Sequence, residues 1–249
     1  MKFLINTNKA NEAKFDCLIL PIFDDHKLRG ATKTINTANN KIISDFQKNK
    51  DIHGKIGQCR ILPVSGKPYK RLVLVGCGKY EKYSEKNYKK ALISALAKLS
   101  TTTHKSAISF LSTSDIFGNK AKTEYRVTKI LAEAWHQISY QYTATKPSNE
   151  KKISLNKLYH GTNGKARSSE MKTGFNHGDA IGKAIKKVRL LADLPSNICT
   201  PTHLANEAKK IGSRHKTVSV KVLNESQMKK LGMNSLLSVT AGAKEPAKM

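Results

Sequence analysis

The chain has 249 residues, enough for one large domain or two smaller ones. A hydrophobic content of 39% fits a globular protein, and no apolar run approaches the roughly 20 residues of a membrane span. The N-terminus has only a short apolar patch at residues 3–5 and lacks the apolar region of a signal peptide. The net charge of +27, from 45 basic and 18 acidic side chains, excludes an acidic or neutral surface. We therefore expect a cytoplasmic protein with no membrane partner.

The first part of the chain alternates strand-like and helix-like segments. Residues 2–6 and the continuous apolar run at residues 17–23 predict strands, the second of a kind that is buried on both faces. The further predicted elements are a helix at 35–47, strands at 57–64 and 71–76, a helix after Ser84, a strand at 107–111, a helix at 123–140 and a strand at 153–159. This order predicts a three-layer α/β domain.

Two helices of this domain carry readable local signals. Ser84 is suited to cap the helix that follows it, because its hydroxyl can accept a hydrogen bond from a free backbone N–H. Tyr88, Leu92 and Leu96 then recur at helical spacing and predict a buried face. The single tryptophan, Trp135, lies in a similar apolar stripe, and we expect it to pack against the sheet.

A second unit is predicted after a polar linker rich in Gly and Ser. A helix is expected from about Gly178 and must end before Pro195, since proline restricts the residue that precedes it. Thr200 is expected to cap the next helix, with Pro201 at its first position. A strand at residues 217–223, a helix at 225–231 and a turn at 241–246 ahead of another strand complete the predicted order.

Three short segments resemble catalytic or phosphate-binding motifs but have simpler explanations. Gly76, Gly78 and Lys79 follow a strand, yet they match neither a P-loop nor a dinucleotide fingerprint, so a tight turn is favoured. The carboxylates next to histidine at residues 24–26 predict a solvated turn. Asp179, in the cluster at residues 176–179, is placed to complement the positive end of the helix predicted to follow it.

The cysteines form no metal-binding or disulfide pattern. The four residues are widely spaced and include no CxxC pair, and three of them lie in strand-like segments. We expect reduced thiols, mostly buried, at Cys17, Cys59, Cys77 and Cys199.

The charge leaves two interpretations open. Only seven of the 45 basic residues are arginine, the residue favoured for base reading and bidentate phosphate contacts, and no run of five basic residues forms an arm. The excess of lysine could serve a DNA-binding face, or it could be a solvated surface that reflects biased composition.

The region from Asp193 to Pro246 resembles the leucyl aminopeptidase family. The resemblance covers residues 178–249 most closely and the first domain more weakly. It is carried by the segments DLPSNICTPTHLA and LGMNSLLSVTAGAKEP, and among their residues we expect structural roles for Pro195, Asn197, Pro201, Gly232, Ser238 and Gly242. Pro195 and Pro201 would bracket a rigid loop in which Ser196 and Asn197 hydrogen-bond the local backbone, although Asn197 could instead position substrate.

The resemblance implies a fold, a reaction and a set of partners. Members are cytosolic, hexameric metallopeptidases that use two divalent ions, Mn or Zn, to remove N-terminal residues from peptides. It implies a macro-like α/β domain at residues 1–160, a linker at 161–169 and the beginning of an α/β catalytic domain at 170–249. The family's lysine and carboxylate metal ligands follow the turn that ends at Pro246, so no catalytic or metal-binding residue is assigned here.

These expectations lead to a prediction of an inactive chain with an incomplete second domain. We expect an unpaired strand edge and an apolar face near residues 231–239. Two other functions remain open: DNA binding, which some members of the family perform, and a non-catalytic assembly or regulatory role. The resemblance of the first domain to macro-type domains also suggests nucleotide binding as a possible function. In the sequence this function is supported only by the glycines at residues 76–78.

Overall fold

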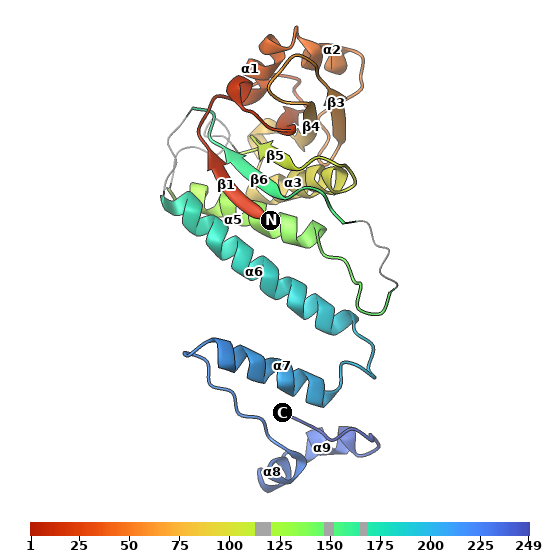
Figure 1. The fold of residues 1–249 in the computed structure, drawn as a ribbon. Coiled ribbons are helices and arrows are strands. Elements are labelled where there is room, and N and C mark those ends of the chain that lie inside the picture. Colours follow the sequence, from red (N-terminus) through yellow and green to blue (C-terminus); the bar gives the residue numbers. More distant parts are fainter. Residues whose placement is uncertain (113–120, 147–151, 165–168) are drawn as a thin grey trace. The chain divides into compact units, whose positions relative to one another are not determined.

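The computed structural model describes residues 1–112, 121–146, 152–164 and 169–249. Its described residues divide into two compact units, Met1–Lys186 and Lys187–Met249 (Figure 1). The strands, all in the first unit, are β1 (Lys2–Asn6), β2 (Cys17–Phe23), β3 (Cys59–Pro63), β4 (Arg71–Gly78), β5 (Ser106–Ser109) and β6 (Lys157–Gly161). The α-helices are α1 (Gly30–Ala38), α2 (Ile42–Lys48), α3 (Glu85–Ser100), α5 (Ala121–Ile138), α6 (Ser169–Asp193), α7 (Pro201–Arg214), α8 (Glu225–Lys230) and α9 (Asn234–Thr240).

The first unit is built on one six-stranded sheet. Its strand order is β1-β6-β5-β2-β4-β3, and every neighbouring pair is parallel except β3 with β4. The antiparallel strand β3 lies at one edge and β1 at the other. Parallel strands need helical crossovers that cover both faces of the sheet, so their side chains are buried on both sides.

Strand β2 shows how the sequence specifies two cores. All seven of its residues are buried, as its continuous apolar run predicts. Cys17 and Ile19 pack on the side of α3 and α5, whereas Leu18 and Leu20 pack on the side of α1 and α2, because neighbouring side chains of a strand point to opposite faces. Helices thus cover both faces, and the predicted three-layer α/β architecture is confirmed (Figure 1).

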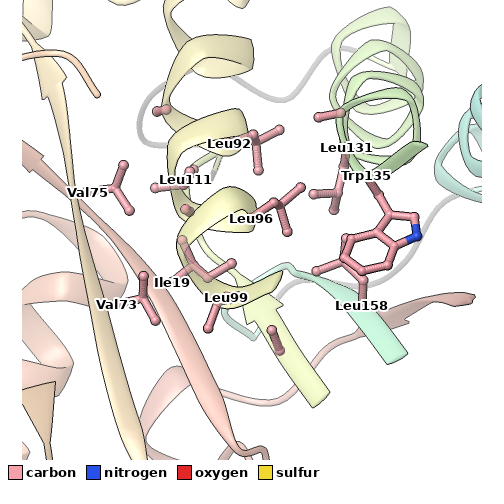
Figure 2. Packing of buried hydrophobic residues seen from close by; sticks show 14 of the residues in the cluster. Ile19, Val73, Val75, Leu92, Leu96, Leu99, Leu111, Leu131, Trp135 and Leu158 are labelled. Atoms are coloured by element: carbon pink, nitrogen blue, oxygen red, sulfur yellow. The ribbon is translucent and has the colours of Figure 1, made fainter. Parts of the chain in front are cut away.

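The larger core lies between the sheet and the helices α3 and α5. Ser84 caps α3 as predicted, with its hydroxyl accepting a hydrogen bond from the Asn87 N–H. Figure 2 shows Leu96 of α3 beside Leu131 and Trp135 of α5, with strand residues completing the cluster. The predicted packing of Trp135 into the core is therefore confirmed.

The helix predicted at residues 35–47 is interrupted. Residues 39–41 separate α1 from α2, and Asn40 and Lys41 adopt positive φ angles of 50° and 62°, which no α-helix contains. The Asn36 side chain stabilises the break by accepting hydrogen bonds from the backbone N–H groups of Ile43 and Ser44. The prediction was wrong because local polar contacts compete with helix continuation.

Two element boundaries also differ from the predicted ones. The strand expected at residues 153–159 is β6, Lys157–Gly161, which lies between β1 and β5 and takes its register from them. The helix expected from Gly178 begins nine residues earlier, at Ser169. Asp179 therefore lies in the interior of α6, and its predicted role at the start of a helix is wrong.

The second unit is helical and has few buried side chains. Its only buried hydrophobic residues are Met228 and Ala247, although α7, α8 and α9 together carry many more apolar residues. The predicted strand at residues 217–223 is absent from this fully described unit. Residues 234–240 form the helix α9 in place of the expected strand edge, but the expected apolar exposure is present, with Leu231 65% and Val239 82% exposed.

Candidate functional site

The carboxylate and histidine residues considered as ligands do not converge. No group of three or more His, Cys, Asp or Glu side chains in the described ranges could hold a metal ion. In the turn after β2, Asp25 is paired with the Arg29 guanidinium, which holds the pKa of that carboxyl below its ordinary value. Asp24 and Asp25 form the expected turn, although both are only partly exposed.

The glycines at the end of β4, Gly76 and Gly78, have a structural explanation. A Cβ at Gly76 would lie 1.9 Å from the carbonyl oxygen of Lys55, so the two backbones approach too closely for any side chain. Gly78 has a φ of +75° and donates its N–H to the carbonyl oxygen of Gly54 at 2.8 Å. Glycine is therefore required by the turn and the backbone approach, without a phosphate ligand.

The thiols are free and three of them belong to the sheet. Cys17 and Cys77 are buried, whereas Cys59 and Cys199 are partly exposed. Burial raises the pKa of the Cys17 and Cys77 thiols to about 12 and that of Cys59 to about 11. These three thiols stay protonated at neutral pH and are poor nucleophiles or metal ligands.

The most developed polar cluster lies between α5 and α6. His136 Nε2 is 2.8 Å from Asp179 Oδ1, and Lys183 Nζ lies 2.6 Å from the other carboxylate oxygen. Burial lowers the pKa of His136, against the opposing effect of Asp179. The pKa of Asp179 is also lowered, because the bonds from Lys183 and His136 outweigh its burial. A neutral His136 thus donates from Nε2 to Asp179 and connects the two helices.

Three glycines let α6 approach α5 closely. Gly174, Gly178 and Gly182 recur every four residues and so share one face of the helix. A Cβ at any of them would lie within 2.4 Å of an atom of the α5 segment Tyr125–His136. The close packing of the two helices, and not flexibility, explains why glycine occurs inside α6.

We expect Gly178→Ala to destabilise the first unit. The added Cβ would lie 2.4 Å from the backbone oxygen of Lys129, which cannot move without displacing α5. Overpacking of this kind costs about 1–3 kcal/mol, and the helix propensity of alanine offsets about 1 kcal/mol of it. Urea unfolding should show a net loss, whereas Asn176→Ala, on the exposed face of α6, should leave stability nearly unchanged.

The loop between α6 and α7 is held by its backbone. The Pro195 carbonyl oxygen accepts hydrogen bonds from the N–H groups of Ile198 and Cys199, both at 2.9 Å. Thr200 caps α7 by accepting from the His203 N–H at 3.2 Å, with Pro201 at the first helical position as predicted. Ser196 and Asn197 are exposed, and within the described residues their side chains make no hydrogen bond, contrary to the expected backbone support.

The remaining residues expected to be structural occupy helix ends and turns. Gly232 follows α8 with a φ of +72° and donates its N–H to the Lys229 carbonyl oxygen, which is the usual role of glycine after a helix. Ser238 lies in α9 and donates to the Ser235 carbonyl oxygen at 2.9 Å. Gly242 follows α9 in open space. These contacts bring no reactive groups together, and the roles assigned to these residues remain predictions.

Glu207 of α7 forms ion pairs within the second unit. Its buried carboxylate is paired with Lys187 of α6 and with Lys210, whose Nζ lies 2.7 Å from Oε1. Hydrogen bonds from these two lysines lower the pKa of Glu207 to about 2. The carboxylate is therefore fully occupied by structural partners and is not available to a ligand.

The second unit contains an apolar groove. It has a volume of about 390 Å³ and lies between α7, α9, the extended residues 220–222 and residues 247–249. Its apolar lining includes Leu204, Val220, Val222, Leu236 and Met249. Thr240, Lys221 and Lys248 also line the groove, but its lining contains no carboxylate side chain, histidine or cysteine.

The fold and these features define a three-layer α/β unit followed by a helical unit. Residues 19–149 match the family model described as the cytosol aminopeptidase family N-terminal domain, and residues 186–249 match the model of the same family's catalytic domain. The chain therefore belongs to the cytosol aminopeptidase family. No helix in the described ranges is long and apolar enough to cross a membrane.

Curated relatives match the whole chain but only half of their own length. A probable cytosol aminopeptidase of Nitrosococcus oceani is 30% identical over 255 residues, covering 100% of this chain and 50% of the relative. One from Haemophilus influenzae (strain PittEE) is 29% identical, covering 100% and 49%. A tomato leucine aminopeptidase mutant has the same fold, with a TM-score of 0.87 and 23% identity over 100% of this chain and 49% of that chain.

Proposed function

We propose that this chain forms the N-terminal domain and the first part of the catalytic domain of a leucyl aminopeptidase-like metallopeptidase. The whole enzyme would remove N-terminal residues from peptides in the cytoplasm. The observation that supports this proposal most directly is the ordered pair of family matches, N-terminal domain at residues 19–149 and catalytic domain at 186–249. Because the chain spans about half the length of its curated relatives, the activity is proposed for the whole enzyme.

The described residues do not fit the two divalent ions, Mn or Zn, that such an enzyme would use. No three potential ligand side chains in these ranges come close enough together, and the carboxylates of Asp25, Asp179 and Glu207 are held by basic partners. No catalytic step is therefore assigned to residues of this chain. We propose that the ligands lie outside these 249 residues.

We expect the purified chain to hydrolyse no leucyl amide in the presence of Mn²⁺ or Zn²⁺. Two-metal hydrolysis needs converging ligands to hold the ions and generate hydroxide. The cytosol aminopeptidase of Haemophilus influenzae, assayed under the same conditions, is the positive control. Clear metal-dependent turnover by the 249-residue protein would contradict the proposal. Sequencing the encoding DNA past codon 249 tests the same point, since the proposal requires a continuation that carries lysine and carboxylate ligands.

The domain division and assembly are further parts of the proposal. We propose a macro-like domain at residues 1–160, a linker at 161–169 and the beginning of the catalytic domain at 170–249. Residues 165–168 of that linker lie outside the described part of the chain. A homohexamer is proposed for the whole enzyme from its resemblance to the family. Light scattering of the chain, alone and mixed with a full-length relative, would test assembly and the alternative of a regulatory subunit.

DNA binding is the second candidate, and it rests on the net charge of +27. If the lysine-rich surface contacts phosphates, protein binding displaces cations condensed on the DNA. Displacing these cations becomes less favourable as the salt concentration rises, so the affinity measured by filter binding should fall steeply with salt. Weak binding that does not change with salt would reject this candidate. The family matches and the named relatives give it no support.

A further inference from the structure

A polar pocket of the first unit gathers basic side chains from separate segments of the chain. It has a volume of about 460 Å³, which lies in the size range of small-molecule sites. Its side chains come from the turn after β2, from α2 and from the segment that follows α2. They are His26, Ser44, Gln47, Lys48, Lys50 and His53. None of these residues is a carboxylate, and each can donate a hydrogen bond to a ligand.

The end of helix α2 does not explain this grouping. A lysine in the last turn of a helix complements the negative end of the helix dipole, but only Lys48 has that position. The two histidines reach the pocket from outside α2. Within the described ranges neither lysine of the pocket forms an ion pair. The carboxylates nearest in the sequence, Asp24, Asp25, Asp45 and Asp51, do not line the pocket.

Lys50 occupies a backbone position that suits glycine. Its φ is 61°, and its N–H donates to the Gln47 carbonyl oxygen at 3.1 Å, while the Asp51 N–H donates to the Phe46 carbonyl oxygen at 3.0 Å. These two bonds form a Schellman motif, in which the left-handed position is usually glycine because a side chain strains it. Lysine at this position costs stability but supplies a side chain to the pocket. Strain that is retained in this way indicates a function for the side chain.

Two uncharged groups of the pocket add donors to those of the lysines. Ser44 Oγ accepts a hydrogen bond from Asn36 Nδ2 at 2.8 Å, which leaves the hydroxyl proton for another acceptor. Gln47 Nε2 is buried and has no hydrogen-bond partner among the described residues. An unpaired buried donor costs free energy, and a ligand oxygen in the pocket would satisfy it. The ammonium, hydroxyl and amide groups together form a donor set that suits an oxyanion.

We propose that this pocket binds the phosphoryl group of a small phosphorylated molecule. A phosphate dianion offers several acceptor oxygens and enough charge to pair with both lysines. The pocket is also larger than a phosphoryl group, so it has room for a polar organic part. The proposal does not depend on the proposed peptidase activity, because every lining residue belongs to the first unit.

Calorimetric titration of the 249-residue chain with glycerol 3-phosphate, and separately with inorganic phosphate, tests the proposal at low and constant ionic strength. We expect saturable binding at one site and chemical-shift changes at the backbone amides of residues 47–53. Lys48→Gln combined with Lys50→Gln should weaken binding about tenfold or more, because both ammonium groups are lost. The matched control is Lys86→Gln with Lys90→Gln, which removes the same charge from exposed positions of α3 and should bind like the original chain.

Lys50→Gly separates binding from folding. Glycine suits the positive φ, so this variant should unfold at a higher urea concentration than the original chain and still bind the two phosphates more weakly. Weaker binding by a more stable protein cannot come from misfolding. Unchanged binding in this variant would contradict the proposal.

The remaining outcomes are equally decisive. Tighter binding of glycerol 3-phosphate than of inorganic phosphate would support an organic phosphate as the ligand, and equal affinities would support recognition of the phosphoryl group alone. Absence of saturable binding at millimolar phosphate overturns the proposal. Equal weakening in the α3 control also overturns it, since the ligand would then sense only the general positive charge of the chain. Shifts at residues 47–53 caused by a DNA duplex, with none caused by either phosphate, would assign the pocket to DNA and reject the small ligand.

Discussion

Leu96→Ala should destabilise the first unit by about 2–5 kcal/mol, the range observed when buried leucines are truncated. Leu96 is fully buried on α3 and packs in the cluster that includes Leu131 and Trp135 of α5 (Figure 2). Truncation removes apolar contacts and leaves a cavity, because α3 is held on its other side by the sheet and cannot collapse into the space.

The measurement can report on this unit alone. Trp135 is the only tryptophan in the chain, so its fluorescence during urea unfolding follows the core next to Leu96. The control is Lys90→Ala, an exposed position on the same helix, which should change stability by less than about 0.5 kcal/mol. An unfolding midpoint shared by the two variants would show that this cluster does not carry the stability of the unit.

The elements that sequence predicts well are those with local signals. Strand β2 could be predicted because seven consecutive apolar or small residues need burial on both faces, and α3 because Ser84 and an apolar stripe specify its start and its buried side. The break between α1 and α2 depends on the side chain of Asn36 reaching Ile43 and Ser44, which helical periodicity does not reveal.

Other errors in the predicted elements arise because a helix or strand depends on neighbouring elements that its own sequence does not reveal. The start of α6 was not predicted because its glycines weaken the helical pattern of the sequence. The structure explains these glycines by the close approach of α5. Residues 217–223 show the reverse case, a correct strand pattern without its ladder in the described chain. The failure of that prediction is itself informative, because a strand needs a neighbour and its sequence can specify only its own half of the pair.

The candidate site could be predicted only in part. Thr200 and Pro201 carry a local capping signal, and the structure places both as expected. The contact of His136 with Asp179 joins residues from two helices and has no signature in the sequence. Its physical basis is the glycine face of α6, which brings the two side chains within hydrogen-bonding distance only after the helices have packed.

The stability of the first unit should fall by about 3 kcal/mol between pH 7 and pH 4 because of His160 alone. His160 lies in β6, opposite Ile5 of β1 and Ser109 of β5, and it is 2% exposed. Burial lowers its pKa from the ordinary 6.5 to about 4, and its Nδ1 has no hydrogen-bond partner among the described residues. The folded protein therefore holds this ring neutral over a range in which the unfolded chain protonates it.

The sign follows from proton binding. Between pH 6.5 and about 4 the unfolded chain binds a proton at His160 that the folded chain does not, so acid favours unfolding, and the stabilisation present above pH 6.5 is lost as the pH falls. The pKa values of His104 and His136 are also lowered by burial and act in the same direction. Only a comparison of variants therefore isolates His160.

Urea unfolding followed by Trp135 fluorescence at pH 7, 6, 5 and 4 measures this difference. In His160→Gln the ring that resists protonation is gone, so the loss of stability on acidification should be smaller than in the original chain by about 3 kcal/mol. His53→Gln, which changes an exposed ring, should keep the original pH dependence. Parallel curves for the His160 variant and the original chain would mean that water or a neighbouring group solvates the protonated ring, so that burial in the strand does not exclude its charge.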